Sequence, residues 1–225
     1  STFIALPGLT LEQGYKEDCL AVLDTMVGDM HNGDFAGSAS AEVAADAPLW
    51  FFWTLQQFEK HVGTKEVWES YGAKMKEVLE AFRRGIGEWV AVDANGLVRA
   101  GHPTLAMTWM DAVVDGKPVT GREGYQVEVN ALWYNAVCYT LELARKYKDK
   151  EFVAAWKDMP EKIKASFIEK FWLDREGYLA DYVTVEGEVN KFIRPNQIIA
   201  CSMDYKMLNS EQCVNVYRVV RQHLA

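Results

Sequence analysis

Two neighbouring stretches with different apolar patterns most constrain the fold of this chain. As a helix, Pro48–His61 would carry large aromatic side chains on several faces, whereas Lys65–Ile86 places its apolar residues along one face. A helix that is apolar all round is buried on several sides, and a one-sided helix covers another surface. The pair therefore predicts two layers, with an inner ring of helices packed inside an outer ring, as in an α/α toroid.

Further segments follow the same rhythm of paired helices. Apolar residues three and four positions apart predict a helix at Glu17–Met30, capped by Gly33, before a loop of small residues at 35–45. Pro7 suits the first helical position in the short apolar segment Ile4–Leu11. Later helices are predicted at Glu128–Lys148, Glu151–Phe171 with a break at Pro160, Arg194–Tyr205 and Ser210–His223.

Short extended pieces interrupt the helices. Trp89–Val92 and Leu97–Ala100 predict two strands around a tight turn, and the alternation in Gly177–Phe192 predicts a hairpin. The long insert at 87–127 is rich in apolar residues, so we expect a functional loop. The sum is a single all-α domain over residues 1–225, with a small β-hairpin.

Composition excludes several classes of function. The chain has 24 basic and 32 acidic residues, a net charge of −8 and no basic stripe, which argues against nucleic acid as a partner. Its apolar runs stay short of the roughly 20 residues that a membrane span needs. Four cysteines without a CxxC pair predict free buried thiols, so we expect a cytoplasmic location. The four histidines lack ligand spacing, and we expect neither a metal nor a cofactor.

One acid in the long insert stands among large apolar side chains. Asp111 follows Trp109 and Met110, and removal from water would favour its protonated form. A proton donor near neutral pH needs that shift, because a free Asp titrates near ~3.9. Trp109 and Trp133 offer flat apolar faces on which sugar rings stack. The residues alone predict a carbohydrate site with Asp111 as the acid; the alternative is that Asp111 is an ordinary turn or N-cap residue.

Four motifs in order carry a resemblance to a known family. Thr-Trp-Met-Asp-Ala at 108–112 and Val-Glu-Val-Asn-Ala-Leu-Trp-Tyr-Asn-Ala at 127–136 resemble the signature of the glycogen debranching enzyme C-terminal (amylo-α-1,6-glucosidase) family. Phe3–Leu9, Ala45–Phe51 and Ile193–Ile198 resemble further stretches of it. The resemblance spans nearly the whole chain.

The resemblance implies a six-hairpin (α/α)6 barrel. Twelve helices of about 11–12 residues, with long loops, need more than 225 residues. We therefore expect roughly two thirds of the barrel here by that count, as a partial copy of the domain or an open ring. The chain also begins inside a structured motif, so upstream residues are expected to be missing.

The resemblance further implies an inverting glycosidase that removes α-1,6-linked glucose from an α-glucan or oligosaccharide. Asp111 would be the general acid, and a second carboxylate ~6.5–9.5 Å away would activate water. In the family that base lies well beyond the Arg-Pro-Asn-Gln segment at 194–197, so we expect it outside this chain. By chemistry alone Glu123, Glu128 or Asp181 could replace it.

Further residues are expected to bind substrate, Trp109 because it lies in the loop beside the acid and the others mostly because they match family positions, and several of them have a purely structural alternative. Asp46 could be only an N-cap, Trp50 and Trp133 only core residues, and the polar residues only helix-start groups. Gly121 and Tyr125 depart from the family pattern, which puts the leaving-group preference in doubt. The substrate-binding set implied is Asp46, Trp50, Trp109, Arg122, Glu128, Asn130, Trp133, Arg194, Asn196 and Gln197.

Two other functions stay open from the sequence. A helical module without catalysis could bind glucan or a partner protein, because no second catalytic carboxylate is evident. A related inverting glycosidase with another linkage preference, such as a trehalase-like enzyme, is the third reading.

Overall fold

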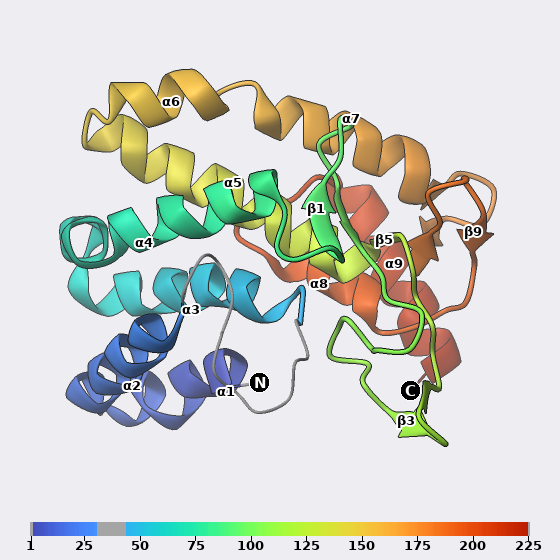
Figure 1. Ribbon diagram of the computed structural model, residues 1–225, viewed down its shortest axis with the longest axis horizontal. Helices are drawn as coiled ribbons and strands as arrows, with labels where there is room; N and C mark the ends of the chain where they lie inside the picture. Colours follow the sequence, from blue (N-terminus) through green and yellow to red (C-terminus); the bar gives the residue numbers. More distant parts are fainter. Residues whose placement is uncertain (1, 31–43, 225) are drawn as a thin grey trace.

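The computed structural model describes residues 2–30 and 44–224, and most of this chain is helical (Figure 1). The predicted cap at Gly33 and the part of the small-residue loop at 35–43 lie outside the described residues.

One row of helices forms the inner layer. It consists of α1 (Thr2–Leu9), α3 (Ala47–Val62), α5 (Val127–Lys146) and α8 (Asn196–Ser202), and each packs against the next in that order. Helix α5 is buried along most of its length, as expected for a helix enclosed on several sides. In Figure 1, α3 and α5 both begin on the right of the view, and α4 runs back between them.

A second set of helices covers this row. It comprises α2 (Lys16–Asp29), α4 (Thr64–Arg84), α6 (Lys150–Trp156), α7 (Met159–Phe171) and α9 (Ser210–Leu224). Helix α4 packs on α3 and α5, α6 and α7 pack on α5, and α9 packs on α8. Tyr71 of α4 donates a hydrogen bond of 2.7 Å to Asp24 of α2. The predicted alternation of inner and outer helices is confirmed, and the described residues hold four such hairpins of a toroid.

The core between the layers is aromatic. Trp133 of α5 stacks on Phe82 of α4 at a centroid distance of 5.6 Å and meets Trp156 of α6 edge-on at 5.9 Å. All three are fully buried, and burying a side chain of this size stabilises the fold by about 1.5–3 kcal/mol. The four cysteines are free thiols, but only Cys19 is buried, so the expectation of four buried thiols is wrong.

Pro7 lies inside α1 and not at its first position, which corrects the prediction. Proline has no N–H and cannot bond to the carbonyl four residues earlier. That carbonyl belongs to Phe3, and the hydroxyl of Thr54 on α3 donates to it at 2.7 Å. A tertiary contact therefore compensates for the proline and ties α1 to α3.

The insert between α4 and α5 carries short strands. The predicted pair β1 (Val90–Val92) and β2 (Val98–Ala100) is confirmed as an antiparallel ladder. A smaller hairpin pairs β3 (Val113–Val114) with β4 (Lys117–Pro118). The strand β5 (Tyr125–Gln126) then leads directly into α5.

The hairpin predicted within Gly177–Phe192 is confirmed at the C-terminal end of that segment, whereas the N-terminal part of the segment belongs to another sheet. Strand β7 (Tyr178–Leu179) pairs antiparallel with the preceding strand β6 (Trp172–Leu173). Strand β8 (Tyr182–Val183) pairs with β9 (Val189–Asn190) and also with β5. Asp181 lies between the two pairings and is buried.

The remaining helix boundaries follow the sequence with two corrections. The predicted break before Pro160 is confirmed, since α6 ends at Trp156 and α7 begins at Met159. Helix α8 ends at Ser202, three residues earlier than predicted. Asn209, not Ser210, caps α9, because its side chain and that of Gln212 each accept the other's backbone N–H at 2.8 and 2.9 Å. In the described ranges we find no helix with the length and apolarity of a bilayer span.

Candidate functional site

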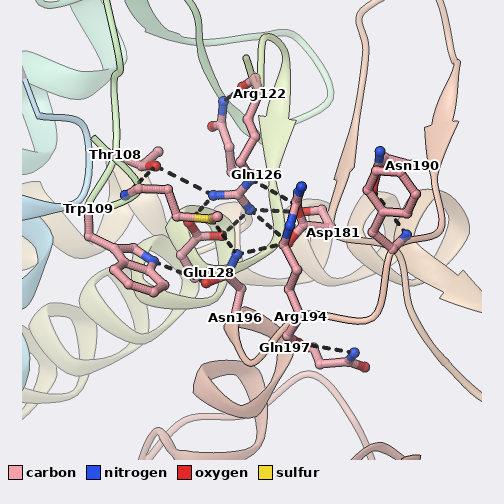
Figure 2. A network of polar contacts seen from close by, with 12 residues as sticks. Thr108, Trp109, Arg122, Gln126, Glu128, Asp181, Asn190, Arg194, Asn196 and Gln197 are labelled. Carbon is pink, nitrogen blue, oxygen red and sulfur yellow. Dashed lines mark hydrogen bonds and ion pairs between the residues drawn. The ribbon is translucent and has the colours of Figure 1, made fainter. Parts of the chain in front are cut away.

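Charged side chains gather where the inner helices begin. Glu128 is the second residue of α5, Asn196 is the first of α8, and Asp46 precedes α3. The insert before α5 contributes Arg122, and the turn after β7 contributes Asp181 (Figure 2). Strand pairing between β5 and β8 places these two segments beside each other.

Arg122 is the centre of a buried ion cluster. Its guanidinium binds both carboxylate oxygens of Glu128, through Nη1 to Oε1 and through Nη2 to Oε2 at 2.7 Å. It also binds Asp181, through Nε to Oδ2 at 2.9 Å and through Nη2 to Oδ1 at 3.1 Å. The side chains of all three residues are almost fully buried. A bidentate pair of this kind is both strong and geometrically specific.

The two carboxylates keep Arg122 in its charged form. Burial by itself lowers the pKa of Arg122, but the hydrogen bonds and negative charges of Glu128 and Asp181 outweigh burial, so the pKa lies above its ordinary value. Both oxygens of Glu128 and of Asp181 accept hydrogen bonds from Arg122, so neither carboxylate has a free oxygen directed at a water. They do not suit the role of general base that their chemistry alone left open.

Asp181 joins the cluster to the next helix. Arg194 donates to its Oδ2, and Asn196 donates to its Oδ1 at 2.8 Å. Its carbonyl accepts the N–H of Val127 at 3.0 Å, where α5 begins. Sequence reasoning weighed Asp181 only as a substitute base and missed this joining role. The signal for it was weak, because its partner Arg122 lies 59 positions away in the chain.

Trp109 is anchored to this network by a hydrogen bond. Its indole Nε1 donates to Oδ1 of Asn196 at 3.0 Å, and Asn196 also donates to the sulfur of Met110 at 3.3 Å (Figure 2). The tryptophan nevertheless stays 49% exposed. A large flat ring that is fixed by its N–H and open on its surface suits contact with an apolar sugar face.

The expected removal of Asp111 from water is wrong in this structure. Asp111 is exposed, two residues after the anchored Trp109. Asp46 is instead the carboxyl group that is removed from water. It is only 5% exposed, and burial first, then the negative charge of Glu128, raises its pKa to about 6. It lies at the predicted N-cap position of α3 but its side chain makes no capping hydrogen bond.

Three residues expected to touch substrate have their side chains inside the fold in this structure. Trp133 is a core residue whose Nε1 donates to the carbonyl of Gly96 at 3.0 Å. Asn130 is fully buried and pairs with the backbone N–H and C=O of Val98, at 2.7 and 3.0 Å. Gln197 accepts the N–H of Leu179 at 3.1 Å. Their polar groups serve the protein itself.

Two other members of the expected set, Trp50 and Arg194, are half-buried. Trp50 is half-buried and packs edge-on against Trp53 at 5.7 Å. Arg194 is half-buried and lies over the ring of Phe192 at 5.3 Å. Over residues 2–30 and 44–224, no group of three His, Cys, Asp or Glu side chains is placed to hold a metal ion.

A buried arginine–carboxylate cluster, a carboxyl group of raised pKa and an anchored, exposed tryptophan thus lie at one end of an α/α-hairpin fold. The comparison with known families gives the class of protein, a glycoside hydrolase type. The amylo-alpha-1,6-glucosidase family matches residues 1–225, and the chain belongs to this family. No curated protein sequence matches the chain.

Two of the solved structures with a similar fold are rhamnosidases. The chain resembles the GH78 family rhamnosidase of Bacillus sp. GL1, with a TM-score of 0.65 and 15% identity over 91% of this chain. It also resembles a rhamnosidase from Klebsiella oxytoca with rhamnose bound, with a TM-score of 0.57 and 13% identity over 83% of this chain. The chain spans 20% and 32% of those proteins, and likeness at this identity concerns the fold alone.

Proposed function

We propose that this chain is part of a glycoside hydrolase that removes α-1,6-linked glucose from an α-glucan by inversion, with Asp111 as the general acid. The family match supports the reaction class. The observation that carries the assignment to this site is the fixed ring of Trp109, because its bond to Asn196 sets the position of the loop that carries Asp111.

Substrate would create the environment that Asp111 lacks without it. A sugar ring stacked on Trp109 displaces water from the neighbouring carboxyl. Desolvation favours the protonated form of an acid, and a protonated acid can give its proton to the departing glycosidic oxygen. In this proposal Asp46 and Arg194 bind sugar hydroxyl groups, while Arg122 and Glu128 hold the loop and α5 in register.

The general base is a separate part of the proposal. Inversion needs a second carboxylate ~6.5–9.5 Å from the acid, with room for a water. Glu128 and Asp181 are both occupied by Arg122. Glu123, the third carboxylate left open by chemistry, is exposed. On the family resemblance we assign the base to a carboxylate outside the 225 residues, on a segment that would follow the Arg194–Gln197 motif.

The test is hydrolysis of a short α-1,6-linked glucoside by this chain and by a C-terminally extended version. We expect turnover in the extended version, with β-glucose as the first product by proton NMR. Asp111→Asn should lower kcat by at least about 100-fold, in the range of general acid catalysis. Asp115→Asn is the matched control, because Asp115 lies in the same insert and its φ of 50° suits asparagine.

Activity in the extended version that Asp111→Asn leaves intact would remove Asp111 from the mechanism. α-Glucose as the first product would exclude inversion. Faster turnover of another glucoside, such as an α,α-1,1-linked one, would keep the acid and change the linkage.

The exposure of Asp111 favours one competing function, a module that binds glucan or a partner protein without catalysis. Its mark would be saturable glucan binding that does not depend on Asp111, with no turnover in either version of the chain.

A further inference from the structure

A hollow lies beside the ion cluster and takes no part in the proposed chemistry. Its volume is about 290 Å³, near the lower end of the roughly 300–1,000 Å³ range of ligand pockets. One side carries Trp89 and Arg99, next to β1 and in β2, and another carries Glu186 in the β8–β9 turn. Glu123 and the backbone of Gly124 lie between these two sides, because Gly124 pairs with Ala100 of β2 and the following strand β5 pairs with β8.

Glycine makes part of this hollow and fixes its shape. Gly124 has a φ of 116°, and a Cβ there would lie 2.4 Å from the carbonyl oxygen of Val183. Gly101 also lines the hollow, and a Cβ on it would meet Glu123 at 3.1 Å. Gly124 has no room for a side chain and Gly101 has little, so at these two positions the hollow is lined by backbone.

The side chains of the hollow combine a flat ring with free polar groups. Trp89 is 36% exposed and is steadied edge-on by His102 at a centroid distance of 4.3 Å. Both hydrogen bonds of Arg99 to Asp93 use Nε. Glu123 and Glu186 are exposed and form no ion pair within the described ranges. The hollow thus offers an apolar face, carboxylate acceptors and arginine donors.

The hollow borders the candidate site. Glu123 follows Arg122 directly, and β8 leads from Asp181 towards the turn that holds Glu186. A small crevice lined by Thr108, Met110 and Arg122 also shares Gly101 and Glu123 with the hollow.

We propose that this hollow binds further sugar units of a neutral α-glucan chain, at a distance from the unit stacked on Trp109. The inference rests on the proposed function for the identity of the sugar. Two unpaired carboxylates beside one arginine disfavour a polyanion and suit hydroxyl groups, which need both acceptors and donors. Trp89 would supply the stacking face.

The test is calorimetric binding of maltoheptaose and of maltose to the 225-residue chain. We expect Trp89→Ala to weaken maltoheptaose binding about five- to tenfold, in the range of aromatic stacking energies, and to change maltose binding less than twofold. Trp89→Phe keeps a flat ring and should recover most of the affinity. Tyr217→Ala, at an exposed aromatic residue of α9, is the matched control and should change neither affinity.

The two proposals fail separately because binding is measured without turnover. Maltoheptaose binding that requires Trp89, in a protein that never hydrolyses an α-1,6 bond, would keep this inference and reject the proposed reaction. Asp111-dependent hydrolysis with Trp89→Ala binding maltoheptaose as tightly as the unaltered chain would reject the inference. It is also overturned if the unaltered chain binds no maltoheptaose, or if dextran sulfate binds the hollow more tightly than dextran.

Discussion

Replacing Arg122 by methionine should leave a buried charge without its partner. Glu128 is fully buried, and Arg122 is the cation paired with it in the described chain. Asp181 keeps Arg194 and Asn196 as partners, so the loss falls mainly on Glu128. Removing one member of a buried ion pair costs about 3–5 kcal/mol, because the desolvated partner is left uncompensated.

The assay is urea denaturation with linear extrapolation to water. For a chain of this size about 1 kcal/mol shifts Tm by roughly 2–4 °C, so Arg122→Met should lower Tm by roughly 6–20 °C. Lys65→Met is the control, because the Lys65–Glu69 pair is 75% and 64% exposed. Such exposed pairs contribute only about 0–1 kcal/mol.

A double-mutant cycle separates the stranded charge from lost packing. Glu128→Gln removes the charge, so Arg122→Met combined with Glu128→Gln should be more stable than the sum of the single losses predicts, by about 1–3 kcal/mol. The reasoning is refuted if Arg122→Met costs less than about 1 kcal/mol, or if the two changes are additive.

Three further outcomes are expected. The pKa of Asp46, raised to about 6 by burial and then by Glu128, means that the folded state binds more protons than the unfolded state between about pH 4 and 6. The free energy of unfolding should therefore fall by about 3 kcal/mol as pH rises through that window, and Asp46→Asn should abolish this fall in urea titrations at each pH. Gly124→Ala should lower Tm sharply because its Cβ would collide with the backbone of Val183, while Gly121→Ala, which meets nothing within 4 Å, should not. Trp109→Ala should weaken maltose binding about tenfold by calorimetry and Trp109→Phe less, with equal loss in both contradicting a stacking role.

The helix pairs were predictable because their signal is local. An aromatic pattern on several faces at Pro48–His61 beside a one-sided pattern at Lys65–Ile86 already distinguishes an inner from an outer helix. The hairpin after Gly177 was predicted, but its further strand partners were not, because alternation indicates a strand and not its partner. The partner β5 lies far away in the chain, and the partner β6 lies just before the predicted segment.

For the candidate site, the sequence pointed to the right segments more reliably than to the state of each side chain. The motifs at 108–112, 127–136 and 193–198 do come together at the start of the inner helices. Asn130, Trp133 and Gln197 nevertheless turn inward and bond within the protein. A motif gives the order of residue types, and it does not show which face of a helix points towards the candidate site.

By itself the sequence determined the two-layered helical architecture and the family, because apolar periodicity and ordered motifs are properties of the chain read along its length. Only the tertiary structure decided that Asp46, and not Asp111, is the acid kept from water, and that Arg122 neutralises both Glu128 and Asp181. Desolvation and ion pairing depend on which distant segments surround a carboxyl group, and that information exists only once the chain has folded.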